Sequence, residues 1–172
     1  MTQAIVSSTR LSLDSLSTDI FLLITTLRPD WSSSNTHLQQ FTGGINNTTF
    51  GLFSNANPSD ALVIKIFGSK TEEFIDRHAE LDTLDLLAQH QLAQPVLLHF
   101  TNGYIYQFLA GEICTRDDIR HPTIVPLIAR EMAKLHSIPM MKNKNSQPCL
   151  IPLMRKFLAL IEDNRYQLEG NS

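Results

Sequence analysis

The most informative segment of the sequence is Ala61-Leu62-Val63-Ile64-Lys65-Ile66-Phe67, which is apolar throughout except for one lysine. A short apolar run of this kind predicts a strand in the interior of a sheet, covered on both faces. A lysine that is buried there without a partner would be costly, so Lys65 needs a counter-charge or a phosphate group. The alternative is that its long side chain carries the ammonium group out to water.

The segments around this strand predict an α+β fold. Asn102-Gly103 lies between two apolar runs and is a strong hairpin signal. Ser69-Lys70-Thr71-Glu72 has the spacing of a capping box and predicts a helix that runs to about His90. Together these signals predict a five-stranded antiparallel sheet with one helix between strands three and four. The other four strands are expected at residues 38–42, 48–54, 96–101 and 104–109.

The ends of the chain differ from this central region. Residues 1–18 are rich in Ser and Thr, and we expect them to be loosely ordered. Apolar residues at helical spacing predict further helices at residues 19–27, 123–137 and 151–162. The predicted organisation is therefore an extension with a short helix, a sheet domain, and a linker with the start of a helical part. These divisions fall at residues 1–37, 38–112 and 113–172.

Composition narrows the classes of function. The 172 residues carry a formal net charge of −3 with a pI of about 6.0, which argues against a nucleic-acid partner. The apolar run at residues 20–24 is far shorter than the ~20 residues of a membrane span. Cys114 and Cys149 form no CxxC motif and no metal-ligand spacing with the histidines, so no metal site is predicted. We expect a cytoplasmic protein.

Lys65 and three further features are candidates for a nucleotide site. Gly43-Gly44 lies between two predicted strands, where it forms either a tight turn or a loop that approaches phosphate oxygens closely. Glu80 lies in the helix after the Lys65 strand, where it either pairs with that lysine or is solvated. Gln107-Phe108-Leu109 ends the last strand, where backbone groups can meet adenine. This order of elements is typical of a protein-kinase-like N-lobe.

Particular motifs add a family resemblance. Phe41-Thr42-Gly43-Gly44-Ile45-Asn46-Asn47 resembles the phosphate-side loop of the choline and ethanolamine kinases. Gly68-Ser69-Lys70-Thr71-Glu72, followed by Asp76-Arg77 and Glu80, resembles ethanolamine kinases in particular. The resemblance extends over residues 38–138 and more weakly to about Ile161.

This resemblance implies transfer of the γ-phosphoryl group of ATP, with Mg²⁺, to ethanolamine, a step towards phosphatidylethanolamine. It implies that Gly43, Gly44 and Asn46 line the phosphates and that Lys65, paired with Glu80, contacts them. It also implies that Gln107, Phe108 and Leu109 hold adenine. The family usually has arginine at the position of Lys65, so the bidentate fork of a guanidinium group is missing here.

The larger departure from the family is an absence. The chain contains no His-x-Asp-x-x-x-x-Asn motif and no later metal-binding Asp, so no catalytic or metal-binding residue is predicted. We therefore expect a truncated C-lobe and no useful catalysis by the chain alone. Two alternatives remain open at this stage. One is a short isoform that binds ATP weakly or modulates a full-length kinase subunit, and the other is a substrate such as choline or an aminoglycoside-like amine.

Overall fold

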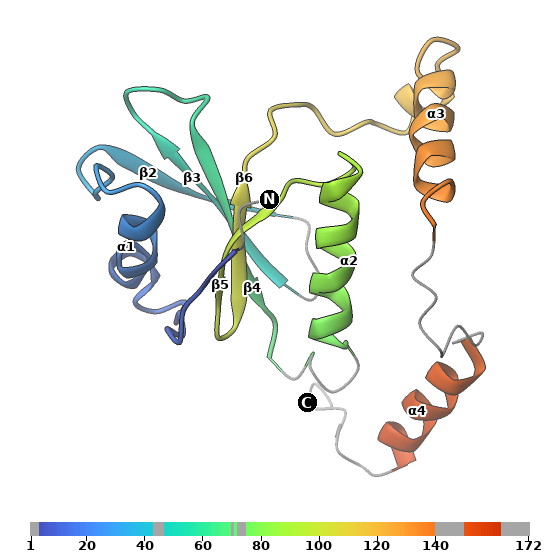
Figure 1. Cartoon of the computed structure of the whole chain (residues 1–172), viewed down its shortest axis with the longest axis horizontal. Helices are drawn as coiled ribbons and strands as arrows, with labels where there is room; N and C mark the ends of the chain where they lie inside the picture. The colour runs from blue at the N-terminus through green and yellow to red at the C-terminus, as the bar shows by residue number, and fades with distance from the viewer. Residues whose placement is uncertain (1–3, 43–46, 70, 72–74, 140–149, 163–172) are drawn as a thin grey trace, which may run out of the picture.

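The structure is a computed structural model, and it describes residues 4–42, 47–69, 71, 75–139 and 150–162. One six-stranded sheet has the strand order β1-β5-β6-β4-β3-β2 (Figure 1). Its strands are β1 (Ile5–Val6), β2 (Thr36–Phe41), β3 (Asn47–Ser54), β4 (Ala61–Phe67), β5 (Val96–Phe100) and β6 (Gly103–Gln107). The helices are α1 (Leu16–Leu27), α2 (Arg77–Gln89), α3 (Val125–His136) and α4 (Leu150–Glu162), with a short 3-10 helix at Asp118–Arg120.

The apolar strand β4 lies inside the sheet as predicted, between β3 and β6. Successive side chains of β4 point to opposite faces, so Leu62, Ile64 and Ile66 enter the main core. Helix α1 covers this face and buries Ile20 and Ile24 against it (Figure 1). Val63, Lys65 and Phe67 therefore face the opposite side, where α2 lies.

The prediction of five strands was wrong, because β1 adds a sixth. It pairs in parallel with β5, with Ile5 opposite Leu98 and Val6 opposite His99. The expectation that residues 1–18 are loosely ordered was also wrong for the described residues 4–18, since Leu11 is buried and one side chain holds its backbone. Asn102 Oδ1 accepts from the Leu11 N–H at 3.0 Å, and Asn102 Nδ2 donates to the Leu11 carbonyl at 2.9 Å. A Ser- and Thr-rich segment thus gains order from a distant hairpin, which local composition does not reveal.

The helix after β4 also begins later than predicted. Helix α2 starts at Arg77, and the Asp76 side chain accepts from the N–H groups of His78 and Ala79. The predicted capping box at Ser69 is therefore not the start of this helix, because Asp76 satisfies the free N–H groups of a helix N-terminus itself. Of its predicted core face, Leu81, Leu84 and Ala88 are only half-buried, and Phe74 lies outside the described residues.

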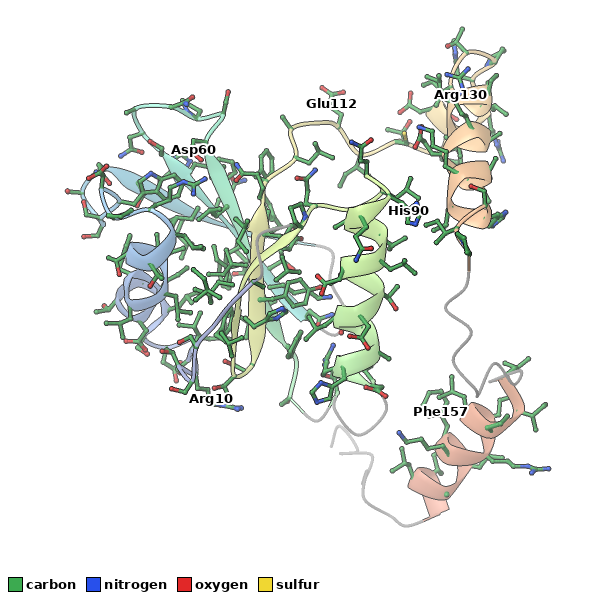
Figure 2. The ribbon with its side chains drawn as sticks, viewed as in Figure 1. Arg10, Asp60, His90, Glu112, Arg130 and Phe157 are labelled. Atoms are coloured by element: carbon green, nitrogen blue, oxygen red, sulfur yellow. The ribbon has the colours of Figure 1, made fainter. Side chains whose placement is uncertain are left out.

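Helices α3 and α4 lie within two residues of their predicted bounds and stand apart from the sheet (Figures 1 and 2). Neither contributes a buried residue to the main core. Apolar side chains are exposed on both helices, among them Leu127, Met132, Leu135, Ile151, Leu153, Met154, Phe157 and Leu158. In the described ranges, no helix is long and apolar enough to cross a membrane.

Candidate active site

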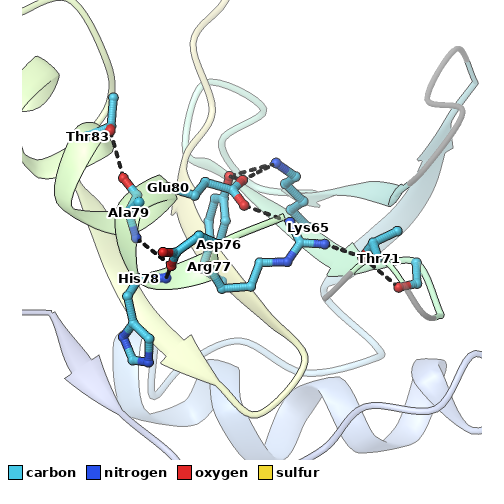
Figure 3. A network of polar contacts seen from close by, with 10 residues as sticks. Lys65, Thr71, Asp76, Arg77, His78, Ala79, Glu80 and Thr83 are labelled. Carbon is cyan, nitrogen blue, oxygen red and sulfur yellow. Dashed lines mark hydrogen bonds and ion pairs between the residues drawn. The ribbon is translucent and has the colours of Figure 1, made fainter. Parts of the chain in front are cut away.

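Lys65 and Glu80 meet on the face of the sheet that α2 covers. The Lys65 ammonium donates to Glu80 Oε1 at 2.8 Å, and each side chain is 21% exposed (Figure 3). Lys65 projects from the centre of β4, and Glu80 lies in the first turn of α2. Because both charges are largely withdrawn from water, each needs the other, and the pair ties α2 to the sheet.

Arg77 is a second cation on the same carboxylate. Its Nη1 lies 2.6 Å from Glu80 Oε2, so the two oxygens of Glu80 serve two different cations (Figure 3). Its Nη2 donates to the Thr71 hydroxyl, and its guanidinium group lies 3.9 Å from the centre of the Phe67 ring. Glu80 is therefore fixed from both sides, and two positive charges surround one negative charge.

The protonation states of the pair follow from these contacts. Burial opposes charging of Lys65, but its hydrogen bonds to Glu80 and Tyr104 outweigh burial and raise the pKa of Lys65. Burial likewise opposes ionisation of Glu80, yet the hydrogen bonds from Lys65 and Arg77 lower the pKa of Glu80. Both groups are therefore charged at neutral pH.

Tyr104 on β6 completes the surroundings of the ammonium group. It lies opposite Lys65 in the β4–β6 register, and its hydroxyl accepts from Lys65 Nζ at 2.9 Å. The same hydroxyl donates to Glu80 Oε1 at 3.2 Å. Burial raises the pKa of Tyr104, so the phenol is neutral at neutral pH.

The end of β6 holds the predicted adenine-binding residues. The Phe108 N–H donates to the Ala61 carbonyl at 2.9 Å, and the Gln107 side-chain amide donates to the same carbonyl at 3.1 Å. Arg28, at the end of α1, donates to Gln107 Oε1 at 3.3 Å and forms an ion pair with Asp60 at 2.9 Å. The Gln107 side chain is therefore structural, and the polar groups of this segment that are left for a ligand are backbone groups. The Leu109 side chain is exposed.

Three phenylalanines gather next to that segment, on the same face as Lys65. Phe108 lies 5.2 Å from Phe53 and 6.2 Å from Phe41, measured between ring centroids. Gly51 lies beneath them, where a Cβ atom would come within 2.6 Å of both the Phe41 and the Phe53 rings. The glycine thus makes room for an aromatic surface, and such a surface can stack on a flat heterocycle.

The predicted phosphate loop is the part of the site that the structure leaves open. Gly43, Gly44 and Asn46 lie outside the described residues. Their neighbours are described: β2 ends at Phe41, β3 begins at Asn47, and Thr49 lies opposite Lys65 in the β3–β4 register. The role of the three loop residues stays a prediction.

A cavity and the distribution of possible metal ligands are two further features of the structure. A cavity of about 800 Å³ lies at the other end of the sheet, and Arg10, Arg77, His78 and His99 are among its lining residues. Lys65, Glu80 and Gln107 are not part of its lining, so cavity size alone would direct attention away from the charged pair. In the described part of the chain, no group of three or more His, Cys, Asp or Glu side chains could hold a metal ion.

Sequence reasoning missed Arg77 and Tyr104 as neighbours of the charged pair. Arg77 lies three residues before Glu80, a spacing that favours ion pairs on a helix, so its sequence position carried a signal. The position of Tyr104 in the sequence does not show this contact. Lys65 and Tyr104 meet only when β6 is aligned with β4 in the register that the structure has.

These observations define a class of protein. A lysine on an inner strand, a glutamate on the next helix and the sheet that carries them have the arrangement of the N-terminal lobe of a kinase-like fold. Within that class, the chain belongs to the choline/ethanolamine kinase family, because the model of that family matches residues 38–171.

Named relatives agree with this assignment. The chain is 36% identical over 116 residues to human ethanolamine kinase 1, an overlap that covers 67% of this chain and 26% of the human protein. It is 33% identical over 155 residues to a probable ethanolamine kinase of Nematostella vectensis, covering 90% of this chain and 44% of that protein. The chain therefore spans less than half the length of these relatives.

Solved structures show the same fold at low sequence identity. The chain resembles an ethanolamine kinase of Plasmodium vivax with a TM-score of 0.75 and 22% identity, covering 96% of this chain and 48% of that one. It also resembles APH(2")-IIa, solved as a ternary complex with streptomycin and ATP, with a TM-score of 0.51 and 16% identity. That match covers 92% of this chain and 54% of the other.

Replacing Glu80 with Gln tests the charged network. We expect the free energy of unfolding to fall by about 2 kcal/mol at pH 7, because two half-buried cations lose their shared counter-charge. The folded-state pKa of Glu80 is lowered, so its contribution is complete above the ordinary value of about 4.3 and is lost as pH falls through the lower folded-state pKa. The difference between E80Q and wild type in urea denaturation should therefore shrink below about pH 4.

A matched control is Glu131→Gln, which breaks the exposed 2.7 Å pair with Lys134 on α3. An exposed pair of this kind contributes little, so E131Q should denature close to wild type at every pH. Equal effects of the two substitutions, or an E80Q effect that does not vary with pH, would contradict the network.

Proposed function

We propose that this chain binds ATP, with Mg²⁺, and is the nucleotide-binding part of a kinase that phosphorylates ethanolamine. The product would be phosphoethanolamine, which leads towards phosphatidylethanolamine. The observation that carries the proposal is the 2.8 Å pair between Lys65 and Glu80, on a sheet whose order is that of a kinase lobe. The following contacts support it.

Lys65 is suited to bind phosphate because its ammonium group has a donor to spare. A protonated lysine carries three N–H bonds, and Glu80 and Tyr104 accept two of them. The local charges also favour an anion, since Lys65 and Arg77 contribute +2 and Glu80 contributes −1, which leaves +1. A phosphate oxygen of ATP would take the third N–H.

The end of β6 is suited to bind adenine through its backbone. Because the Phe108 N–H points to Ala61 on β4, the backbone groups of Gln107 and Leu109 point to the opposite edge. The pairing of β6 with β5 extends only to Tyr106, so that edge is open. The Gln107 carbonyl and the Leu109 N–H therefore offer one acceptor and one donor, which match the edge of an adenine ring.

Phosphoryl transfer is a different matter from binding. The chain contains no His-x-Asp sequence, and its described residues form no group that could hold a metal ion. These residues do not by themselves fit a Mg²⁺ site, so we derive no catalytic step from them. We propose that the 172 residues bind nucleotide without turning over substrate.

The choice of ethanolamine rests on the relatives. The human and Nematostella proteins, at 36% and 33% identity, are named as ethanolamine kinases. We infer the same substrate for the kinase to which this lobe belongs, in preference to choline.

The exposed side chains of α3 and α4 favour a second role, which is contact with a full-length kinase of the same family. Met154 and Leu158 on α4 are both exposed apolar residues, and a surface of this kind favours a protein partner. Co-purification with human ethanolamine kinase 1 tests this role, with M154E/L158E as the variant expected to abolish it. Failure of the wild-type chain to co-purify would exclude it.

The binding proposal predicts a specific loss of affinity in Lys65→Met. Removal of the ammonium group should weaken Mg²⁺-ATP binding at least tenfold by calorimetry, because a charge-assisted bond to phosphate is lost. Arg77 still neutralises Glu80 in this variant, so the fold should persist. Lys134→Met, on exposed α3, is the matched control and should bind like wild type.

The wild-type 172-residue chain should form no phosphoethanolamine when it is incubated with Mg²⁺-ATP and ethanolamine. Product formed by the 172-residue chain would overturn the separation of binding from catalysis. Equal affinity of K65M and K134M would overturn the assignment of the phosphate site to Lys65.

A further inference from the structure

We propose that Tyr104 is a positioning residue, whose hydroxyl together with Glu80 fixes the Lys65 ammonium group for phosphate binding. The inference rests on the proposed function for its purpose, but its geometry is independent of any nucleotide. Three hydrogen bonds close a triangle: Lys65 to Glu80 at 2.8 Å, Lys65 to Tyr104 at 2.9 Å, and Tyr104 to Glu80 at 3.2 Å.

The triangle uses each group according to its chemistry. A charged lysine can only donate, and an ionised carboxylate can only accept, while a phenol does both. Tyr104 therefore accepts from Lys65 and donates its one proton to Glu80. No donor faces a donor and no acceptor faces an acceptor, so the arrangement is self-consistent at neutral pH.

A second anchor matters because of the shape of lysine. Its ammonium group is a compact charge at the end of a flexible four-carbon stem, and one hydrogen bond leaves it free to swing about that bond. Two bonds to fixed partners define where the nitrogen lies and where the remaining N–H points. An arginine would reach Glu80 with two nitrogens of one planar group and would need no such helper.

Tyr104 is itself well fixed. Tyr104 is only 4% exposed, and the centre of its ring lies 5.8 Å from the ring centres of both Phe67 and Tyr106. Lys65 Nζ also lies 5.1 Å from the centre of the Tyr104 ring, close enough for a cation–π attraction. The β-sheet register places the two residues opposite each other, so the backbone alone brings them together.

Close approach of the strands at this point adds a constraint. Gly103 precedes Tyr104, and a Cβ atom on it would come within 2.0 Å of the Lys65 carbonyl oxygen. Only glycine lets β6 lie this near to β4, and this approach sets the position of the Tyr104 ring. The close approach of β6 to β4 therefore fixes Tyr104 relative to Lys65.

The test compares Tyr104→Phe with Tyr106→Phe. The first substitution removes the hydroxyl that bonds Lys65, and the second removes a neighbouring half-buried hydroxyl on the same strand. Thermal melts establish that both variants are folded. Two readouts follow, one without nucleotide and one with it.

Without nucleotide, NMR measures proton exchange at the Lys65 ammonium group near neutral pH, with K65R used to assign the signal. Exchange should be at least about threefold faster in Y104F than in wild type or Y106F, because one of its hydrogen bonds is lost. With Mg²⁺-ATP, Y104F should bind roughly three- to tenfold more weakly than wild type, and Y106F within about twofold.

The double variant K65R/Y104F supplies a rescue. Since arginine holds Glu80 by its own fork, removal of the hydroxyl should change the affinity of K65R less than about twofold. A structural role for the hydroxyl would lower affinity in both backgrounds equally.

The outcomes separate this inference from the proposed function. If Y104F matches Y106F in both exchange and affinity, Tyr104 does not position Lys65. If exchange accelerates in Y104F while the wild-type chain binds no ATP, the positioning role holds and the proposed function fails.

Discussion

The salt bridge between Lys65 and Glu80 is the interaction on which the rest of the site depends. It joins the inner strand β4 to α2, which otherwise contributes no fully buried residue to the fold. Apolar packing holds α1 on the other face, where Ile20 and Ile24 enter the main core. The two faces of the sheet thus differ: fully buried apolar side chains hold α1, whereas half-buried apolar side chains and paired charge hold α2.

Within the network of Lys65, Arg77 and Glu80, the charges leave one cation in excess. Glu80 gives one oxygen to Lys65 and the other to Arg77, so the carboxylate is fully used while the ammonium group keeps a donor. The neighbouring aromatic cluster and the open end of β6 lie on the same side of the sheet, because Phe53, Phe108 and Lys65 share one face of the pleat. A ligand with a flat ring at one end and negative charge at the other fits this distribution. ATP has that shape.

Sequence reasoning succeeded where the signal was local. The apolar run around Lys65 predicted an inner strand, and the helix after it offered Glu80 as the counter-charge, which the structure brings to 2.8 Å. It failed where order comes from distant contacts. Residues 1–18 were expected to be loosely ordered, yet Asn102, in the turn between β5 and β6, holds the backbone of Leu11. Tyr104 was overlooked for the same reason, since its contact with Lys65 exists only once two strands are in register. Two local signals could have started α2, the capping box at Ser69 and the side chain of Asp76. The structure uses Asp76.

We propose that nucleotide binds on the face that carries Lys65, and a titration of the ¹⁵N-labelled chain with Mg²⁺-ATP examines this binding residue by residue. We expect the amide chemical shifts to change around Lys65 on β4, around Glu80 on α2 and at residues 107–109. Shifts that instead gather around the cavity at the other end of the sheet, at Arg10 and Thr101, would contradict it. So would a spectrum that does not change at millimolar ATP.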